Sequence, residues 1–89
     1  MGSKNKNRVA VLGGDHVGPG DKVRFLTPKE IKFYDLEPAE KDQELFVKVG
    51  GSPFMVTDVV RKTGGHGFIH SEHQGTNFTV SSGLVRVAR

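Results

Sequence analysis

The side chains best suited to chemistry in this 89-residue chain lie in one short segment near residue 70. His66, His70, Glu72 and His73 could supply the three protein ligands of an open zinc site. If the segment is a β-strand, His66 and His70 share a face but lie about 13 Å apart at roughly 3.3 Å per residue. Imidazoles that bind one ion converge on bonds of about 2.1 Å, so only a tight bend at residues 65–67 would bring them together. We therefore expect surface or edge-strand histidines, with no metal and no other cofactor.

The glycine-rich stretch at residues 13–20, GGDHVGPG, is a second candidate, because such loops can cradle phosphate. It lacks the Gly-Lys-Ser/Thr ending, and the sequence after it favours a strand where a phosphate loop requires a helix. Asp15 and His16 are adjacent and would point apart on an extended backbone, which disfavours an acid–base pair. The stretch predicts a turn with glycines at positive φ, and the chain is not expected to be an enzyme.

Aromatic side chains offer one kind of binding surface. Phe33 and Tyr34 fall in a segment expected to be a short helix, where Ile31 and Tyr34 share one side and Phe33 points elsewhere. One of the two aromatic rings is therefore expected to be exposed. Phe46 and Phe68 are the other aromatic candidates. An exposed ring suits contact with a partner protein or stacking on a nucleic-acid base.

Cationic side chains offer the alternative surface, for DNA or RNA. The candidates are Arg24, Lys48, Arg61, Lys62 and Arg86. On alternating strands Arg24, Lys48 and Arg86 would each point away from their apolar neighbours, so several could line one outer face. The same pattern is typical of an ordinary solvated surface.

The charge distribution argues against a strongly basic domain. The formal net charge is +3, and Lys4, Lys6 and Arg8 account for all of it. Residues 27–44 carry six acidic side chains against three lysines, whereas the chain after them is mildly basic. This dipolar layout is weaker than the one-faced clustering of Lys and Arg expected of a nucleic-acid module.

Several short elements must position these residues. Thr27 and Glu30 have the spacing of a capping box, and with Pro28 at the first helical position they predict a helix through about Tyr34. Gly50–Pro53 would turn a central β-hairpin between two runs rich in β-forming residues, 45–49 and 54–60. The remaining expected elements are strands at 8–12, 22–26, 67–71, 76–81 and 84–88, with a loop at 13–20.

Together these elements predict a mainly all-β fold, a single small SH3-like β-barrel over residues 8–89 with a short helical acidic insertion at 27–44. An OB-type barrel is the second choice. Residues 1–7 are expected to form a disordered basic tail. The chain has no cysteine and no apolar run near the roughly 20 residues of a membrane span, so we expect a cytoplasmic protein that does not bind membranes.

A resemblance to a known family covers about residues 45–88. Val49-Gly50-Gly51, Pro53, Met55-Val56-Thr57 and Val59, followed by the terminal LVRVA, resemble the core pattern of small bacterial proteins of the YodC type. The resemblance implies an SH3-like barrel. It implies no defined activity. The chain as a whole is interpreted as a small bacterial or phage-type accessory protein.

The sequence thus favours a small non-enzymatic binding or adaptor module. It would engage a protein partner, or itself as a homo-oligomer, through the barrel face or the insertion, because a domain this small gains much by burying a second surface. The alternative is a low-specificity DNA- or RNA-binding accessory protein that uses the arginines and lysines named above together with the basic tail.

Overall fold

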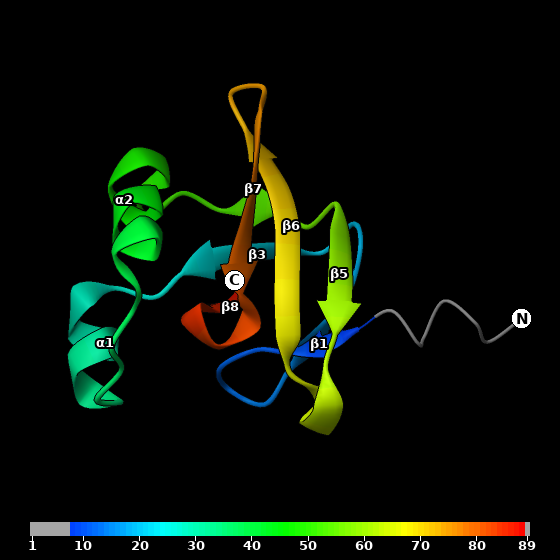
Figure 1. Cartoon of the computed structure of the whole chain (residues 1–89), viewed down its shortest axis with the longest axis horizontal. Helices are drawn as coiled ribbons and strands as arrows, with labels where there is room; N and C mark the ends of the chain where they lie inside the picture. The colour runs from blue at the N-terminus through cyan, green and yellow to red at the C-terminus, as the bar shows by residue number, and fades with distance from the viewer. Residues whose placement is uncertain (1–7, 89) are drawn as a thin grey trace, which may run out of the picture.

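The structure, a computed structural model, describes residues 8–88. Its content is mostly β, as the sequence predicts, with two helices between the third and fourth strands (Figure 1). The elements in chain order are β1 (Val9–Ala10), β2 (His16–Val17), β3 (Lys22–Phe25), α1 (Pro28–Phe33), α2 (Glu40–Val49), β4 (Phe54–Met55), β5 (Asp58–Arg61), the 3-10 turn η2 (Thr63–Gly65), β6 (Gly67–His73), β7 (Thr76–Ser81), the 3-10 turn η3 (Ser82–Leu84) and β8 (Val85–Val87).

The strands form three small antiparallel sheets, in the orders β1-β2, β4-β3-β8 and β5-β6-β7. Single backbone hydrogen bonds join one sheet to another: Leu12 N donates to Val85 O at 3.1 Å, and Thr57 N donates to His70 O at 2.9 Å. These bonds do not close one continuous barrel within residues 8–88. The structure therefore shows a small antiparallel β domain, and the predicted SH3-like barrel is not confirmed.

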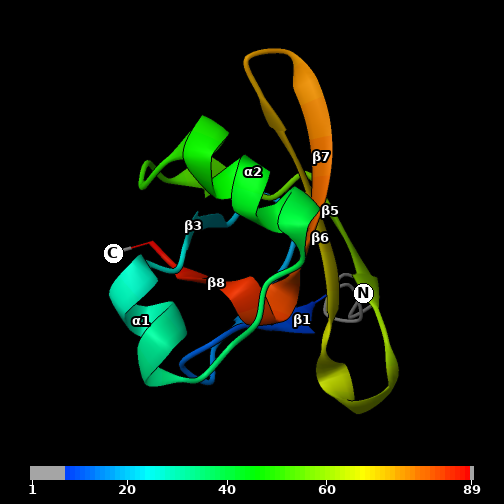
Figure 2. The same ribbon diagram turned by 60° about the vertical axis from the view of Figure 1, so that its left-hand side comes forward.

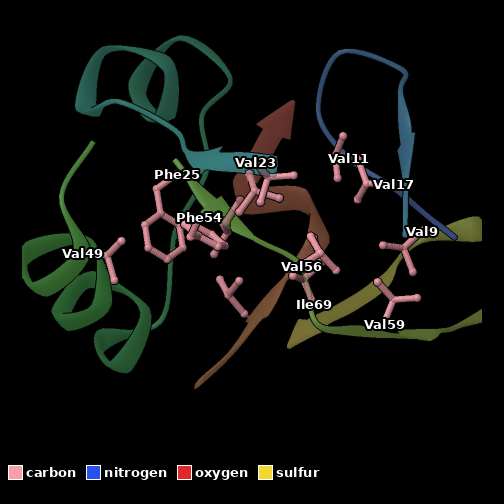
Figure 3. Packing of buried hydrophobic residues seen from close by; sticks show 13 residues of the cluster. Val9, Val11, Val17, Val23, Phe25, Val49, Phe54, Val56, Val59 and Ile69 are labelled. Carbon is pink, nitrogen blue, oxygen red and sulfur yellow. The ribbon is translucent and has the colours of Figure 1, made fainter. Parts of the chain in front are cut away.

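One hydrophobic core lies between the sheets (Figure 3). Strand alternation builds it, because residues two apart on a strand share a face: Val23 and Phe25 on β3 are buried, and so is Ile69 on β6. The Phe25 ring lies 4.8 Å from Phe46 and 4.9 Å from Phe54, measured between ring centroids. This aromatic cluster fills the end of the core that α2 covers.

The predicted central hairpin is wrong. The strand predicted at 54–60 is divided into β4, which pairs with β3, and β5, which pairs with β6, and residues 45–49 belong to α2. Apolar residues in this run fit a helical period better than an alternating one: Leu45 and Val49 are four residues apart and both pack against the core, while Val47 is exposed. Four of the five residues at 40–44 are good helix formers, and these residues extend the same helix upstream. Gly50 ends α2 with a φ of 71°, a conformation that favours glycine.

Elsewhere the prediction differs mainly in detail. The predicted insertion at 27–44 holds α1 and the start of α2. Helix α2 continues to Val49, five residues beyond the predicted end of the insertion. The strand predicted at 8–12 is reduced to β1, and the loop predicted at 13–20 contains the short strand β2. The strands predicted at 22–26, 67–71, 76–81 and 84–88 are present. The predicted disordered tail, residues 1–7, lies outside the described residues.

Among residues 8–88, neither helix has the length and apolar character needed to cross a membrane.

Candidate functional site

Helix α1 starts at the capping box that the sequence predicts. The backbone N of Glu30 donates to Thr27 Oγ1 at 3.2 Å, and the backbone N of Thr27 donates to Glu30 Oε1 at 2.9 Å. Pro28 occupies the first helical position, where its missing N–H costs nothing. The box fixes both the start of α1 and the direction of the Glu30 side chain.

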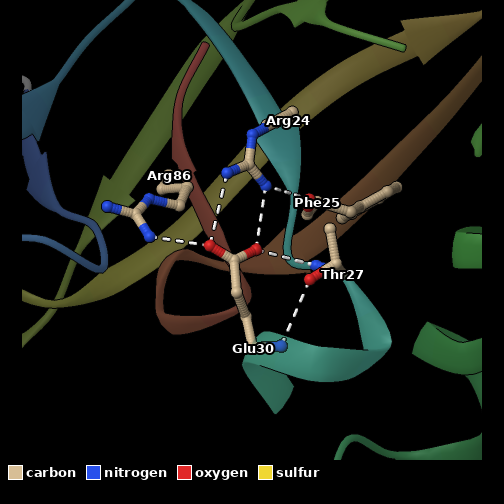
Figure 4. Close-up of polar contacts among 5 residues, drawn as sticks. All are labelled: Arg24, Phe25, Thr27, Glu30 and Arg86. Carbon is tan, nitrogen blue, oxygen red and sulfur yellow. Dashed lines mark hydrogen bonds and ion pairs between the residues drawn. The ribbon is translucent and has the colours of Figure 1, made fainter. Parts of the chain in front are cut away.

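The Glu30 carboxylate also fastens α1 to the sheet. Arg24 on β3 and Arg86 on β8 are cross-strand partners, so their side chains leave the sheet side by side. Arg24 donates from Nη1 to Glu30 Oε1 at 3.0 Å and from Nη2 to Oε2 at 3.3 Å, and Arg86 donates from Nη1 to Oε2 at 2.7 Å (Figure 4). We call this arrangement of Glu30, Arg24 and Arg86 the Glu30 clamp.

The hydrogen bonds of the clamp favour the ionised form of the Glu30 carboxyl group. The hydrogen bonds from Arg24 and from the Thr27 backbone, with a smaller contribution from Arg86, hold the pKa of the Glu30 carboxyl far below its ordinary value. The hydrogen bond to Glu30 raises the pKa of Arg24 in return. One carboxylate thus faces two guanidinium groups, and the three side chains remain partly open to water, with exposures of 20%, 29% and 34% for Glu30, Arg24 and Arg86.

Two aromatic rings stand beside the clamp. Phe33 is 80% exposed and Tyr34 is 43% exposed, and their ring centroids lie 4.9 Å apart in an edge-to-face arrangement. Both rings are therefore exposed, where the sequence predicted one, and no residue of α1 is buried. An open hollow of about 480 Å³ lies between these rings and the clamp, and its lining includes Lys29. We call Lys29, the clamp, Phe33 and Tyr34 the α1 surface.

The other two aromatic candidates lie elsewhere. Phe46 is half-buried against the core, in contact with Phe25. Phe68 lies on the outer face of the sheet β5-β6-β7, 41% exposed, with Lys62 Nζ 5.8 Å from its ring centroid. The structure thus brings only Phe33 and Tyr34 of the four together.

The five cationic candidates are also divided. Arg24 and Arg86 meet in the clamp, whereas Lys48 lies on α2, since its segment is a helix and not a strand. Arg61 and Lys62 lie at the end of β5, on the far side of the molecule from α1 (Figure 2). Of the three residues predicted to line one outer face, Arg24 and Arg86 lie side by side, whereas Lys48 does not join them.

Three of the four histidines lie on or next to β6, which is the central strand of its sheet and not an edge strand. His66 precedes β6 and is exposed, and His73 ends the strand. His70 Nδ1 forms a 2.8 Å hydrogen bond with Thr79 Oγ1 across the β6-β7 pair. Within residues 8–88 no three metal-binding side chains converge.

Sequence reasoning missed the role of Glu30, which it identified only as part of the capping box. The available signal was the charge of Arg24 and Arg86 at outward positions of two strands, but their pairing with Glu30 depends on strand register.

Comparison with family models, with curated proteins and with solved structures finds no match to this chain.

Proposed function

We propose that this chain is a small non-enzymatic binding module that engages a partner protein through the α1 surface. The observation that carries the proposal is the 80% exposure of Phe33 beside a fixed cluster of charged groups. A phenyl ring that projects into water contributes nothing to the core, yet it costs the free energy of an exposed apolar group.

The composition of the α1 surface supports a protein partner. Aromatic residues and arginine are enriched at the centres of protein interfaces, and tyrosine and arginine are common among the residues that dominate binding energy. The clamp holds α1 in place, which lowers the ordering cost that a flexible helix would pay on binding. Phe33 and Tyr34 are thus presented on a fixed support.

The finer architecture that fits this function is a partly open SH3-like barrel built from the three sheets. Its support is the shared core and the backbone bonds between sheets, such as Leu12 N to Val85 O. A barrel of this kind leaves loops and insertions free to carry binding residues. Helix α1 occupies such an insertion.

A second candidate, the binding of single-stranded nucleic acid, is favoured by the same hollow. Arg24, Arg86 and Lys29 lie beside aromatic rings on which bases could stack. Two observations count against it. Glu30 compensates one of these positive charges, and Arg61 and Lys62 lie far from the α1 surface. The protein partner is therefore the first choice.

Affinity capture with three forms of the chain tests the proposal. Proteins recovered by the wild-type chain should be lost with Phe33→Ala and retained with Phe68→Ala, which removes an aromatic ring from the outer face of β6. Both variants remove exposed side chains, so both should fold, as far-UV circular dichroism can verify. Equal recovery by all three forms would reject the α1 surface.

Fluorescence anisotropy with labelled single-stranded DNA and RNA decides the second candidate. Phosphate contacts would give binding that weakens steeply as salt rises and that is reduced by Arg86→Gln. Absence of binding at low salt would exclude it.

A further inference from the structure

Strand β7 forms the end of its sheet, so one of its edges has no strand beside it within residues 8–88. The two-residue turn before it, Gln74 and Gly75, has φ values of 52° and 82°, which are of the kind that a tight hairpin turn requires. The residues that flank such a turn, His73 and Thr76, form a hydrogen-bonded pair, and pairs with and without hydrogen bonds then alternate along the ladder. Thr76 thus sets which backbone groups of β7 face β6.

This alternation directs the N–H and C=O groups of Asn77 and Thr79 away from β6, toward the open edge. The neighbouring strand agrees, since His70, the partner of Thr79, accepts from Thr57 N on the opposite side of β6. Asn77 and Thr79 are exposed, and within residues 8–88 no backbone hydrogen bond reaches their outward groups. Two N–H and two C=O groups are therefore available on one short edge.

The edge carries none of the usual protection against pairing. Edge strands are commonly blocked by charged side chains, by proline or by a bulge. Strand β7 has the sequence TNFTVS, without a charged residue or a proline, and its register against β6 is continuous. The strand can therefore accept another strand.

Helix α2 lies on the β7 side of this sheet (Figures 1 and 2), and a hollow of about 370 Å³ lies between the helix and β7. Leu45 and Val49 of α2 and Phe78 of β7 give the hollow apolar walls, and Lys48 and His73 supply hydrogen-bond donors. The described residues that line it include no carboxylate. Its volume falls in the range of about 300–1,000 Å³ that is typical of ligand pockets.

We propose that β7 and α2 form a groove for an extended peptide of a partner protein, which adds a strand to the open edge of β7. Main-chain hydrogen bonds to Asn77 and Thr79 supply the pairing, and alternate side chains of the peptide supply the selectivity. The peptide side chain opposite Phe78 shares the face of Phe78 and enters the hollow. In an antiparallel pair, the side chain two positions later lies opposite Thr76, on that same face.

Charge identifies the peptide as one that carries an acidic residue. The side chain opposite Thr76 lies at the His73 end of the groove, because His73 is the ladder partner of Thr76. Lys48 lines the same hollow and forms no ion pair within residues 8–88. Glu44 lies one turn before Lys48 on α2, outside the lining. The favoured motif is an apolar residue followed two positions later by glutamate.

The same reasoning disfavours two other occupants. A second copy of this chain, paired through its own β7, would bring no acidic side chain to the groove. Residues 1–7 of this chain contain lysines and no acidic residue, so they would bring like charge to Lys48. A partner peptide with a carboxylate matches the groove in both its apolar and its cationic parts.

Fluorescence anisotropy with a short labelled peptide that has Leu-Thr-Glu at its centre tests the proposal. The wild-type chain should bind this peptide. N-methylation of the central threonine should weaken binding by at least about tenfold, because that threonine N–H would donate to Asn77 O. Lys48→Glu should weaken binding to a similar extent and should reverse the preference, so that a Leu-Thr-Lys peptide binds better than Leu-Thr-Glu. Lys62→Glu, the same change at the far end of β5, should behave as the wild type does.

Asn77→Pro tests the open edge itself. The substitution removes an N–H that β6 does not use, and proline is tolerated on edge strands at such positions. The variant should keep its far-UV circular dichroism spectrum and lose the peptide. If it fails to fold, the N-methylated peptide and Lys48→Glu still decide.

Three results would overturn the proposal. The first is the absence of Leu-Thr-Glu binding at about 1 mM; the second is equal binding of the methylated and unmethylated peptides; the third is a preference that Lys48→Glu leaves unchanged. Self-association that Asn77→Pro abolishes, without peptide binding, would assign the edge to a second copy instead. Phe33→Ala should leave peptide binding unchanged, because the groove shares no lining residue with the α1 surface. This inference and the proposed function can therefore fail separately.

Discussion

Replacement of Glu30 by glutamine tests how firmly the clamp fastens α1. The substitution keeps the length of the side chain and leaves an amide oxygen that can accept from the Thr27 backbone N, so the capping box survives in part. It removes the negative charge that faces Arg24 and Arg86 at 2.7–3.3 Å. The change therefore isolates the charged part of the clamp.

The expected cost follows from the burial of the three groups. Hydrogen bonds to charged groups contribute about 1.5–3 kcal/mol when water is excluded, and fully exposed ion pairs contribute about 0.2–1 kcal/mol. The Glu30 side chain is 20% exposed and the arginines somewhat more, so water screens part of the interaction. We expect Glu30→Gln to lower the free energy of unfolding by about 1–2 kcal/mol, which for a domain of this size lowers Tm by about 4–16 °C.

The pH dependence gives this prediction a second, independent signature. The pKa of Glu30 is depressed in the folded chain, whereas a glutamate in the unfolded chain titrates near about 4.3. The clamp therefore contributes its full stability above about pH 5 and loses it progressively as the pH falls toward the lower folded-state value. The difference in stability between the wild type and Glu30→Gln should shrink over that range.

Thermal and urea unfolding followed by far-UV circular dichroism, at pH 7 and at steps down to pH 2.5, measure both effects. Glu72→Gln is the matched control, because Glu72 is exposed on β6 and its replacement should change stability by no more than about 0.5 kcal/mol. Equal midpoints for the two variants at pH 7 would refute the clamp as a source of stability. A Glu30→Gln deficit that persists unchanged in acid would refute its assignment to the ionised carboxylate.

Two further predictions concern the sheets. Gly67→Ala should prevent stable folding, because a Cβ there would lie 1.9 Å from Val60 O, whereas Gly51→Ala, which meets no atom within 4 Å, should leave Tm nearly unchanged in a thermal melt. Ser71→Ala should lower the free energy of urea unfolding by about 1 kcal/mol, because buried Ser71 Oγ donates to Met55 O at 2.6 Å; an unchanged midpoint would show that this bond adds nothing.

Local signals in the sequence predicted the local structure well. Thr27 and Glu30 are three residues apart, and their capping box forms as expected because both partners lie within one turn of helix. The strands after residue 66 follow from alternation that no helical period fits. The prediction of a strand at residues 45–49 failed because so short a run is compatible with both the helical and the strand period. The helix-forming residues upstream of it favour the helix.

The candidate site could be predicted only in its parts. Phe33 and Tyr34 were recognisable as a pair of aromatic residues on a short helix. Arg86 is separated from Glu30 by 56 residues, and their contact depends on the register of β8 against β3. Register of a strand that distant is set by the whole core, so no local pattern reveals that the arginines and the aromatic rings share one surface.

Site-specific photo-cross-linking measures the central claim most directly. A benzophenone analogue of phenylalanine would replace Phe33 in one form of the chain and Phe68 in another, and both would be irradiated in cells that express them. We predict discrete protein adducts from position 33, to a second copy or to another protein, and few from position 68. Adducts that form at position 68 but not at position 33 would contradict the claim that α1 presents the binding surface.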